Sequence, residues 1–345
     1  MTGGASGRIA KTDLPPVPSA PWISDEAALE AEIEALSERI RSEAEPEHER
    51  MLLRLRNLLA ILRLERPAPD QGRPAPDYEG LPSGPLIEIE PSRLTPGVLR
   101  AGILRHGCVL VRGLLDENRA GQLAQEIERC FQERRRYDAG KSFLERYYAP
   151  FEHDPRHGIG LLRDWVAMAG GVFAVDSPVI SFRMTETFRE AGLPELLTGY
   201  LGQAPLQAAD KTTLRRAEPS VDGAWHQDGK FMGPVRALNL WLALSHCGED
   251  APGLDLVPRR LDEHVPTQTD GVRMLNQVSH QAAELAAGEL PILRPVFEPG
   301  DALLFDELFL HKTASDRSMR RPRYAIESWF FAPSGFPSDY IPLTI

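Results

Sequence analysis

Two stretches near the start of the chain carry apolar residues at helical spacing. In the first, Leu29, Ile33, Leu36 and Ile40 recur every three or four positions among Glu and Arg. The second covers residues 47–65, after Pro46 interrupts the pattern, and its apolar side holds Met51, Leu52, Leu55, Leu58, Leu59 and Leu62. Such spacing is typical of amphipathic helices. Residues 23–65 are therefore predicted to form a helical hairpin, which packs either on the rest of the chain or on another subunit.

The segments on either side of this hairpin contain many residues that break regular structure. Residues 1–22 hold Gly, Ser and Pro with few apolar residues, and they are predicted to form a flexible tail. Residues 66–85 repeat Pro together with Gly and Asp, which predicts a stiff linker. We therefore expect a domain boundary at this linker and one domain over residues 86–345.

The domain begins with a mixture of strands and helices. Strands are predicted at residues 86–89 and 108–111, and helices from Pro96 onward and at residues 117–134 and 193–201. Residues 140–180 give no clear pattern. After Gly202 the chain changes to short apolar runs separated by turn residues, at 206–216, 237–244, 254–257, 292–297, 302–305 and 324–332. This pattern favours a β-sandwich or barrel. We expect an α+β protein with a mainly β core.

Composition and charge argue against several classes of protein. The 345 residues carry a formal net charge of -11, with a pI near 5.4, whereas a nucleic-acid partner calls for a basic face. No apolar run approaches the roughly 20 residues that span a bilayer, and the N-terminus lacks an apolar signal segment. The three cysteines form no CxxC pair, so neither a disulfide framework nor a cysteine zinc site is indicated. We expect a cytoplasmic protein without membrane or nucleic-acid partners.

His226, Asp228 and His311 form a candidate metal site. Residues two apart on a strand point to the same face, so His226 and Asp228 would supply two adjacent ligands and His311 the third. Among nine histidines, His226 alone heads a His-x-Asp or His-x-Glu triplet. Such a triplet often arises by chance, and a lone His near a strand end is commonly structural. The β-rich context and a downstream Arg favour metal binding, and two imidazoles with one carboxylate form the facial triad of Fe(II) oxygenases.

Arg323 and Thr313 favour iron over zinc at this site, although two His and one carboxylate also bind catalytic zinc. Arg323 begins an alternating run, and Thr313 lies two residues after His311. A guanidinium pairs with a carboxylate through two hydrogen bonds, so a cation and a hydroxyl beside the metal suit 2-oxoglutarate. A surface ion pair is the alternative role for Arg323, and Arg317, Arg320 and Arg321 are rival cations.

Several motifs of this region resemble those of the phytanoyl-CoA dioxygenase family. They are Trp225-His226-Gln227-Asp228-Gly229, Leu240-Trp241-Leu242-Ala243-Leu244, Ala251-Pro252-Gly253-Leu254 leading to Val257-Pro258, and Gly300-Asp301 before His311. The resemblance is motif-specific over residues 205–332 and weaker over 86–204, and the first 85 residues have no counterpart. It implies a double-stranded β-helix (jelly roll) flanked by helices, with Fe(II) as cofactor and 2-oxoglutarate as cosubstrate.

The resemblance also implies roles for individual residues. His226, Asp228 and His311 would be the iron ligands. Arg323 and Thr313 would bind the distal carboxylate of 2-oxoglutarate, and Trp241 would wall the cosubstrate pocket, unless it is simply part of the core. Halogenating relatives replace the ligand carboxylate by a small residue, so Asp228 favours hydroxylation, with desaturation and ring formation left open.

Basic residues near the predicted site suggest an anionic substrate. Many relatives carry Ser-His after the Val-Pro turn, where this chain has Arg259 and Arg260, and Lys230 and Arg236 follow the His-Gln-Asp triplet closely. Solvated surface charge is the alternative explanation for all four.

We therefore expect a dioxygenase that uses O2 to hydroxylate a small molecule, with release of succinate and CO2. Two other classes of function stay open, a non-catalytic metal- or ligand-binding jelly roll and a metal-dependent hydrolase on the same fold. The helical hairpin suggests a homo-oligomer.

Overall fold

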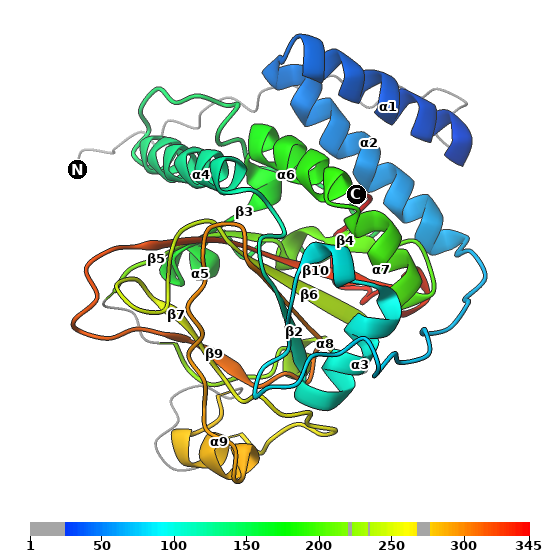
Figure 1. Ribbon diagram of the computed structural model, residues 1–345. Helices are drawn as coiled ribbons and strands as arrows, with labels where there is room; N and C mark the ends of the chain where they lie inside the picture. The colour runs from blue at the N-terminus through cyan, green and yellow to red at the C-terminus, as the bar shows by residue number, and fades with distance from the viewer. Residues whose placement is uncertain (1–24, 220–222, 234, 268–276) are drawn as a thin grey trace, which may run out of the picture.

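The fold was described from a computed structural model over residues 25–219, 223–233, 235–267 and 277–345 (Figure 1). The predicted tail, residues 1–22, lies outside these described residues. The helices are α1 (Glu26–Ser42), α2 (Pro46–Glu65), α3 (Pro96–His106), α4 (Glu117–Asp138), α5 (Arg163–Met168), α6 (Pro178–Glu190), α7 (Leu193–Leu201), α8 (Gly229–Met232) and α9 (His280–Ala287). The strands are β1 (Glu88–Ile89), β2 (Cys108–Val111), β3 (Gly171–Phe173), β4 (Leu206–Ala208), β5 (Thr213–Ala217), β6 (Ala237–Ala243), β7 (Gly253–Leu256), β8 (Ala302–Phe305), β9 (His311–Ala314), β10 (Arg323–Phe331) and β11 (Pro342–Leu343).

Two sheets face each other and enclose an apolar interior. The larger sheet has the order β1-β2-β8-β6-β10-β4-β11, with β5 beside β10 and β3 beside β5, and the smaller sheet pairs β7 with β9. One core cluster takes Trp241 and Trp329 from the larger sheet and Leu254 and Leu256 from the smaller one. The two sheets therefore form a jelly roll, and the predicted fold class is confirmed.

The opposite face of the larger sheet is covered by helices. In Figure 1, α4, α6 and α7 lie on the side of β6 and β10 that faces away from the small sheet. Ile127 of α4, Phe188 of α6 and Leu197 of α7 share a core cluster with Ile326 and Phe330 of β10. Successive residues of β10 thus alternate between the helical layer and the interior of the jelly roll, as a strand buried on both faces requires.

Helix α3 shows how local sequence sets the elements. Thr95 caps its start, with the Thr95 Oγ1 accepting a hydrogen bond from the Val98 N–H at 3.2 Å, and Pro96 occupies the first turn, as predicted. The helix ends at Gly107, whose φ of 80° is left-handed. A Cβ at this position would lie 2.7 Å from Phe309, so both the turn and the close packing require glycine.

The strand pattern differs from the prediction in two places. Residues 206–216 form β4 and β5, separated by a short 3-10 turn at Ala209–Lys211, rather than one run. Residues 292–297 form only the isolated bridges of Leu293 with Leu256 and of Phe297 with Cys247. Apolar alternation reports which side chains are buried, but it does not report whether a neighbouring strand continues long enough to pair.

The predicted hairpin corresponds to α1 and α2, and it packs on the rest of the chain. Its apolar stripe meets Phe182 of α6, and Leu53 of α2 lies in a cluster with Ile341 and Leu343 beside β11. The Asn57 side chain donates to the Pro342 carbonyl at 2.8 Å. Of the two arrangements left open by the sequence, packing on the main domain is therefore the one observed. Self-association through these helices stays a prediction.

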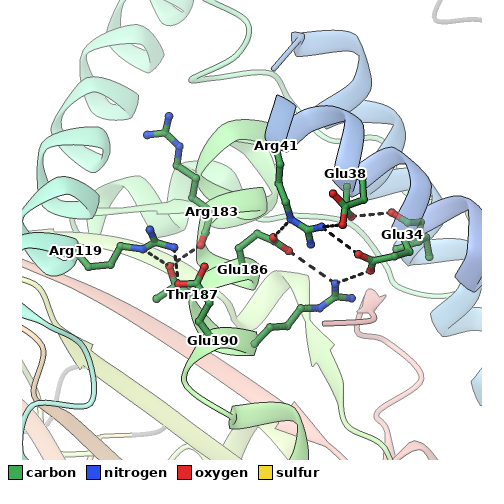
Figure 2. A network of polar contacts seen from close by, with 11 residues as sticks. Glu34, Glu38, Arg41, Arg119, Arg183, Glu186, Thr187 and Glu190 are labelled. Carbon is green, nitrogen blue, oxygen red and sulfur yellow. Dashed lines mark hydrogen bonds and ion pairs between the residues drawn. The ribbon is translucent and has the colours of Figure 1, made fainter. Parts of the chain in front are cut away.

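Ion pairs add to this apolar contact. Figure 2 shows Arg41 of α1 between Glu38 of the same helix and Glu186 of α6, at 2.7 and 2.5 Å. In α2, the buried carboxylate of Glu49 accepts three hydrogen bonds from Arg146, the shortest at 2.7 Å. A buried carboxylate needs such a partner, because ionised groups are costly to remove from water.

The predicted linker lies along the surface of the domain. The N–H of Gln71 donates to the Gly202 carbonyl at 3.0 Å, and the N–H of Asp77 donates to the Gly97 carbonyl at 2.9 Å. These bonds fix the segment over the ends of α7 and α3. The domain boundary at residues 66–85 stays a prediction. Within the described ranges, no helix is both long and apolar enough to cross a membrane.

Candidate metal centre

The three predicted metal ligands meet inside the jelly roll. His226 and His311 form an antiparallel bridge, in which each backbone N–H donates to the other residue's carbonyl, at 3.0 and 3.2 Å. The Nε2 of His226 lies 4.0 Å from Oδ1 of Asp228, and the Nε2 of His311 lies 3.9 Å from Oδ2. One ligand atom from each residue lies within 4.8 Å of the other two. Segments 85 positions apart in sequence thus supply one cluster.

Both imidazole rings are oriented by the backbone of their own segment. The His226 Nδ1 lies 2.8 Å from the Ala224 carbonyl, and the His311 Nδ1 lies 3.2 Å from the Phe309 carbonyl. A carbonyl only accepts, so each Nδ1 carries the proton and each Nε2 lone pair is free for a metal ion. Burial, followed by the nearby His226 ring, lowers the pKa of His311 to about 3. The His311 ring is therefore neutral near pH 7, as a metal ligand must be.

Asp228 reaches the cluster from a backbone conformation that the sequence did not predict. The strand expected to carry both His226 and Asp228 is present only as isolated bridges at Trp225 and His226. Asp228 immediately precedes α8 and has helical backbone angles, with φ −63° and ψ −27°. The Asp228 Oδ2 is buried and has no hydrogen-bond partner within the described residues. An unpaired buried carboxylate oxygen is costly. A cation between Asp228 and the two imidazoles would remove that cost, so these residues fit a metal ion.

Gln227, which sequence reasoning passed over, holds the triplet in place. Its side chain is buried and points into the protein. Its amide donates to the carbonyls of Leu308, at 2.6 Å, and Glu263, at 3.3 Å, and its oxygen accepts from the Val265 N–H at 2.7 Å. A polar residue between two ligands is the only sequence signal for this role, and it identifies neither partner. Gln227 ties the turn between the ligands to two other loops.

We expect Gln227→Leu to weaken metal binding without displacing a ligand. Loss of a partner that orients metal ligands typically costs about 10- to 100-fold in metal affinity. The Leu308 carbonyl and the Val265 N–H would also lose a buried partner, which costs about 1–3 kcal/mol of stability. Anaerobic calorimetry with Fe(II) measures the first effect. Gln132→Leu on α4 is the matched control, and an affinity equal to wild type in Gln227→Leu would contradict the positioning role.

Arg323 lies fully buried at the start of β10, on the inward face of the sheet. Burial lowers the pKa of Arg323 to about 10, so the guanidinium stays charged at neutral pH. It donates to the Gly253 carbonyl at 3.2 Å and lies 5.2 Å from the Trp241 ring, and its Nε has no partner. Among the residues with described positions, no carboxylate forms an ion pair with it. Arg323 is therefore a buried cation positioned for an acid that the described chain does not supply.

The other two predicted cosubstrate residues share this interior. Thr313 lies on β9, two residues after His311, so both side chains point to the same face of the small sheet. Trp241 of β6 is 4% exposed and packs on Phe297, with ring centroids 4.8 Å apart. Trp241 thus belongs to the core and also lies against Arg323, so the two roles considered from sequence are compatible.

The four basic residues predicted to bind an anionic substrate are dispersed. Arg236 pairs with Asp70 of the linker, and Arg260 pairs with the buried Asp306. Arg259 donates to the Ala286 carbonyl at 3.4 Å, and Lys230 is exposed on α8. For Arg236 and Arg260, a structural ion pair accounts for the charge. An anion-binding role for Lys230 and Arg259 stays a prediction.

Comparison with known proteins gives one family match and several distant structural likenesses. The family model described as phytanoyl-CoA dioxygenase (PhyH) matches residues 103–325. No curated protein matches the chain. Among solved structures, AviO1 from Streptomyces viridochromogenes Tue57 is 18% identical, with a TM-score of 0.46 over 71% of this chain and 98% of its own. EctD from S. alaskensis, determined with 2-oxoglutarate and 5-hydroxyectoine, is 17% identical, with a TM-score of 0.48 over 78% and 89%. The non-heme alpha-ketoglutarate-dependent epimerase SnoN from nogalamycin biosynthesis is 22% identical, with a TM-score of 0.41 over 68% and 81%.

Proposed function

This chain belongs to the phytanoyl-CoA dioxygenase family, and from that premise we propose that it is a dioxygenase dependent on Fe(II) and 2-oxoglutarate that hydroxylates a small molecule. The observation that carries the proposal is the cluster of His226, Asp228 and His311, in which a buried carboxylate oxygen has no partner within the described residues. Three ligands on one side of an ion leave positions for a cosubstrate and for O2.

The chain's own residues perform binding and positioning. His226 and His311 direct their Nε2 atoms at the metal position because their Nδ1 atoms are held by carbonyls, and Asp228 supplies the negative charge. Phe305 and Phe309 pack against the His311 ring, with centroids 4.8 and 5.8 Å away, and they exclude water from that side. Iron with 2-oxoglutarate would supply the oxidation, in which O2 converts 2-oxoglutarate to succinate and CO2 and a substrate C–H bond to C–OH.

Arg323 and Thr313 are proposed to bind the distal carboxylate of 2-oxoglutarate. A carboxylate matches the planar fork of the guanidinium and neutralises a charge that is otherwise buried without an acid partner. Trp241 beside Arg323 would form the wall of that pocket. Asp228 occupies the position that halogenating relatives leave to a halide, which favours hydroxylation as the outcome.

The proposal is tested with purified protein under anaerobic conditions. Fe(II) is added first and 2-oxoglutarate second, and the visible band of a 2-oxo acid chelated to Fe(II) is recorded. We expect the band in the wild-type protein and a weaker one in Thr313→Val. Release of succinate after O2 is admitted measures turnover.

The outcomes separate the three classes of function considered. Metal binding without the band, combined with metal-dependent ester or amide cleavage, would favour a hydrolase. Metal binding with neither band nor cleavage would favour a binding module. If succinate forms but the substrate gains no oxygen, the proposed dependence on 2-oxoglutarate stands and the proposed hydroxylation is wrong.

A further inference from the structure

Two charged side chains point into the jelly roll from neighbouring strands of the larger sheet. In the antiparallel register of β5 and β10, Arg215 lies opposite Ala325 and Thr213 lies opposite Glu327, and across β6, Glu327 lies opposite Trp241. Directly opposed residues share a face of a sheet. Ala325 and Trp241 belong to the interior cluster, so Arg215 and Glu327 also face the interior.

Arg215 and Glu327 are both partly accessible to solvent. Their apolar neighbours on the same face are closed off, since Ala325 is 0% and Trp329 1% exposed. Arg215 and Glu327 are only half-buried, as are the ligands His226 and Asp228. Burial lowers the pKa of both His311 and Arg323, and the nearby Glu327 carboxylate opposes the decrease in each. Glu327 therefore lies close to both the metal ligands and the cation of the cosubstrate pocket.

Neither charge is neutralised by the part of the chain that the structure describes. The side chain of Arg215 has no hydrogen bond or ion pair there, and the Glu327 carboxylate has one contact, from the Thr213 Oγ1 at 3.5 Å. Asn239, on the same face opposite Trp329, is fully buried, and both atoms of its amide lack a partner. Unpaired polar groups in an apolar interior are costly. On this face, the side chains of Asn239 and Arg215 have no partner among the described residues and Glu327 has one, which indicates a polar ligand rather than a structural network.

Arg215 lies near the cosubstrate cation, since burial and, in addition, the positive charge of Arg215 lower the pKa of Arg323, but the Arg215 side chain extends toward another strand. A Cβ built on Gly171 of β3 would lie 3.5 Å from the Arg215 Nη1, so the guanidinium extends toward β3. Arg323 lies at the other side of β5, opposite Ala217. A molecule that contacts both Arg215 and Glu327 would therefore lie across β5 and β10, beside the Arg323 pocket.

We propose that Glu327 and Arg215 recognise the primary substrate, with Glu327 binding a basic nitrogen and Arg215 an acidic group of the same molecule. The substrate class is thus a small zwitterion of the amino-acid type. This inference rests on the proposed function, because it assigns the substrate side of the same site. It places substrate specificity in the sheet interior rather than in the basic residues after the His-Gln-Asp triplet.

The test measures binding by anaerobic calorimetry to protein loaded with Zn(II) and 2-oxoglutarate, so that no turnover occurs. The probes are the L-amino acids together with 6-aminohexanoate, and the singly charged controls are hexylamine and hexanoate. We expect at least one zwitterion to bind about 10-fold or more tightly than either control. Glu327→Gln and Arg215→Gln are each expected to weaken that binding by about 10- to 100-fold, as loss of a hydrogen bond to a charged group does.

The variants also distinguish this inference from the proposed function. Arg216→Gln is the matched control, because Arg216 is the next residue of β5 and points outward to Glu128. Affinity for 2-oxoglutarate should be unchanged in all three variants. If the wild type binds 2-oxoglutarate but no zwitterion, or if Glu327→Gln binds zwitterions as the wild type does, this inference is overturned and the proposed function stands. If Arg215→Gln loses only 2-oxoglutarate affinity, Arg215 binds the cosubstrate rather than the primary substrate, and this inference is overturned. A wild type that binds no 2-oxoglutarate overturns both.

Discussion

Replacing His311 by leucine is expected to abolish metal binding and all turnover of 2-oxoglutarate while the protein stays folded. Leucine fills a similar volume beside Phe305 and Phe309 but has no nitrogen, so only His226 and Asp228 remain as ligands. Loss of a direct ligand should exceed the 10- to 100-fold cost of losing an outer partner. The apo variant should be at least as stable as the apo wild type, because its buried side chain is apolar.

Thermal unfolding with and without metal measures this effect. A metal at about 100 times its dissociation constant stabilises a folded protein by roughly 2.7 kcal/mol, so the wild type should unfold at a clearly higher temperature with metal than without. His311→Leu should give no such difference. His246→Leu is the control, since His246 is exposed and lies beside Glu298 and Glu249. If metal raised the unfolding temperature of His311→Leu as much as that of the wild type, His311 would not be a metal ligand.

Replacing Arg323 by methionine is expected to weaken 2-oxoglutarate binding without destabilising the apo protein. The guanidinium is buried without an acid partner among the described residues, so its desolvation opposes folding of the apo protein, and an apolar side chain avoids that cost. Truncating one partner of a buried charge pair costs about 2–5 kcal/mol, which predicts 2-oxoglutarate binding about 30- to 5,000-fold weaker. The variant should therefore be no less stable than the wild type and yet bind 2-oxoglutarate poorly.

Two further variants sharpen this result. Arg323→Lys retains the charge but cannot form two parallel hydrogen bonds, so it should bind 2-oxoglutarate with intermediate affinity. Arg321→Met removes a guanidinium that pairs with Asp250 at the surface, and it should change neither property. Calorimetry measures the affinity for 2-oxoglutarate, and chemical unfolding of the apo proteins measures their stability. A variant with a large loss of stability and normal 2-oxoglutarate affinity would make Arg323 a structural residue.

The sequence predicted most elements because apolar spacing reports burial. The predicted strand at residues 108–111 coincides with β2, and the predicted helix at 193–201 coincides with α7. The pairing of His226 with Asp228 could be found because the two lie close in sequence. Residue type and order, together with a family resemblance, selected His311 as the third ligand. Apolar periodicity alone does not indicate that His311 lies beside His226 and Asp228.

What the sequence could not predict depends on contacts between distant segments. Asp228 is helical because the turn around it is fixed by Gln227, whose partners lie at residues 263–265 and 308. The inward direction of Glu327 follows from the register of β10 with β5 and β6, and a shift of one residue would turn it to the helical layer. The sequence did not show that Arg236 pairs with Asp70 and that Arg260 pairs with Asp306. Their charges were therefore interpreted as ligand-binding.

The contact of the N-terminal hairpin with β11 has a consequence for how the protein is made. Asn57 binds the Pro342 carbonyl across 285 positions, and the Leu53 side chain packs with Ile341 and Leu343. At about 5–20 residues per second, a ribosome needs roughly 15–60 s to add the intervening chain. The hairpin is made before β11, so this side of it stays uncovered while the intervening chain is translated. When β11 is made, it covers this side of the hairpin, so the final packing of α2 depends on a strand that is translated much later.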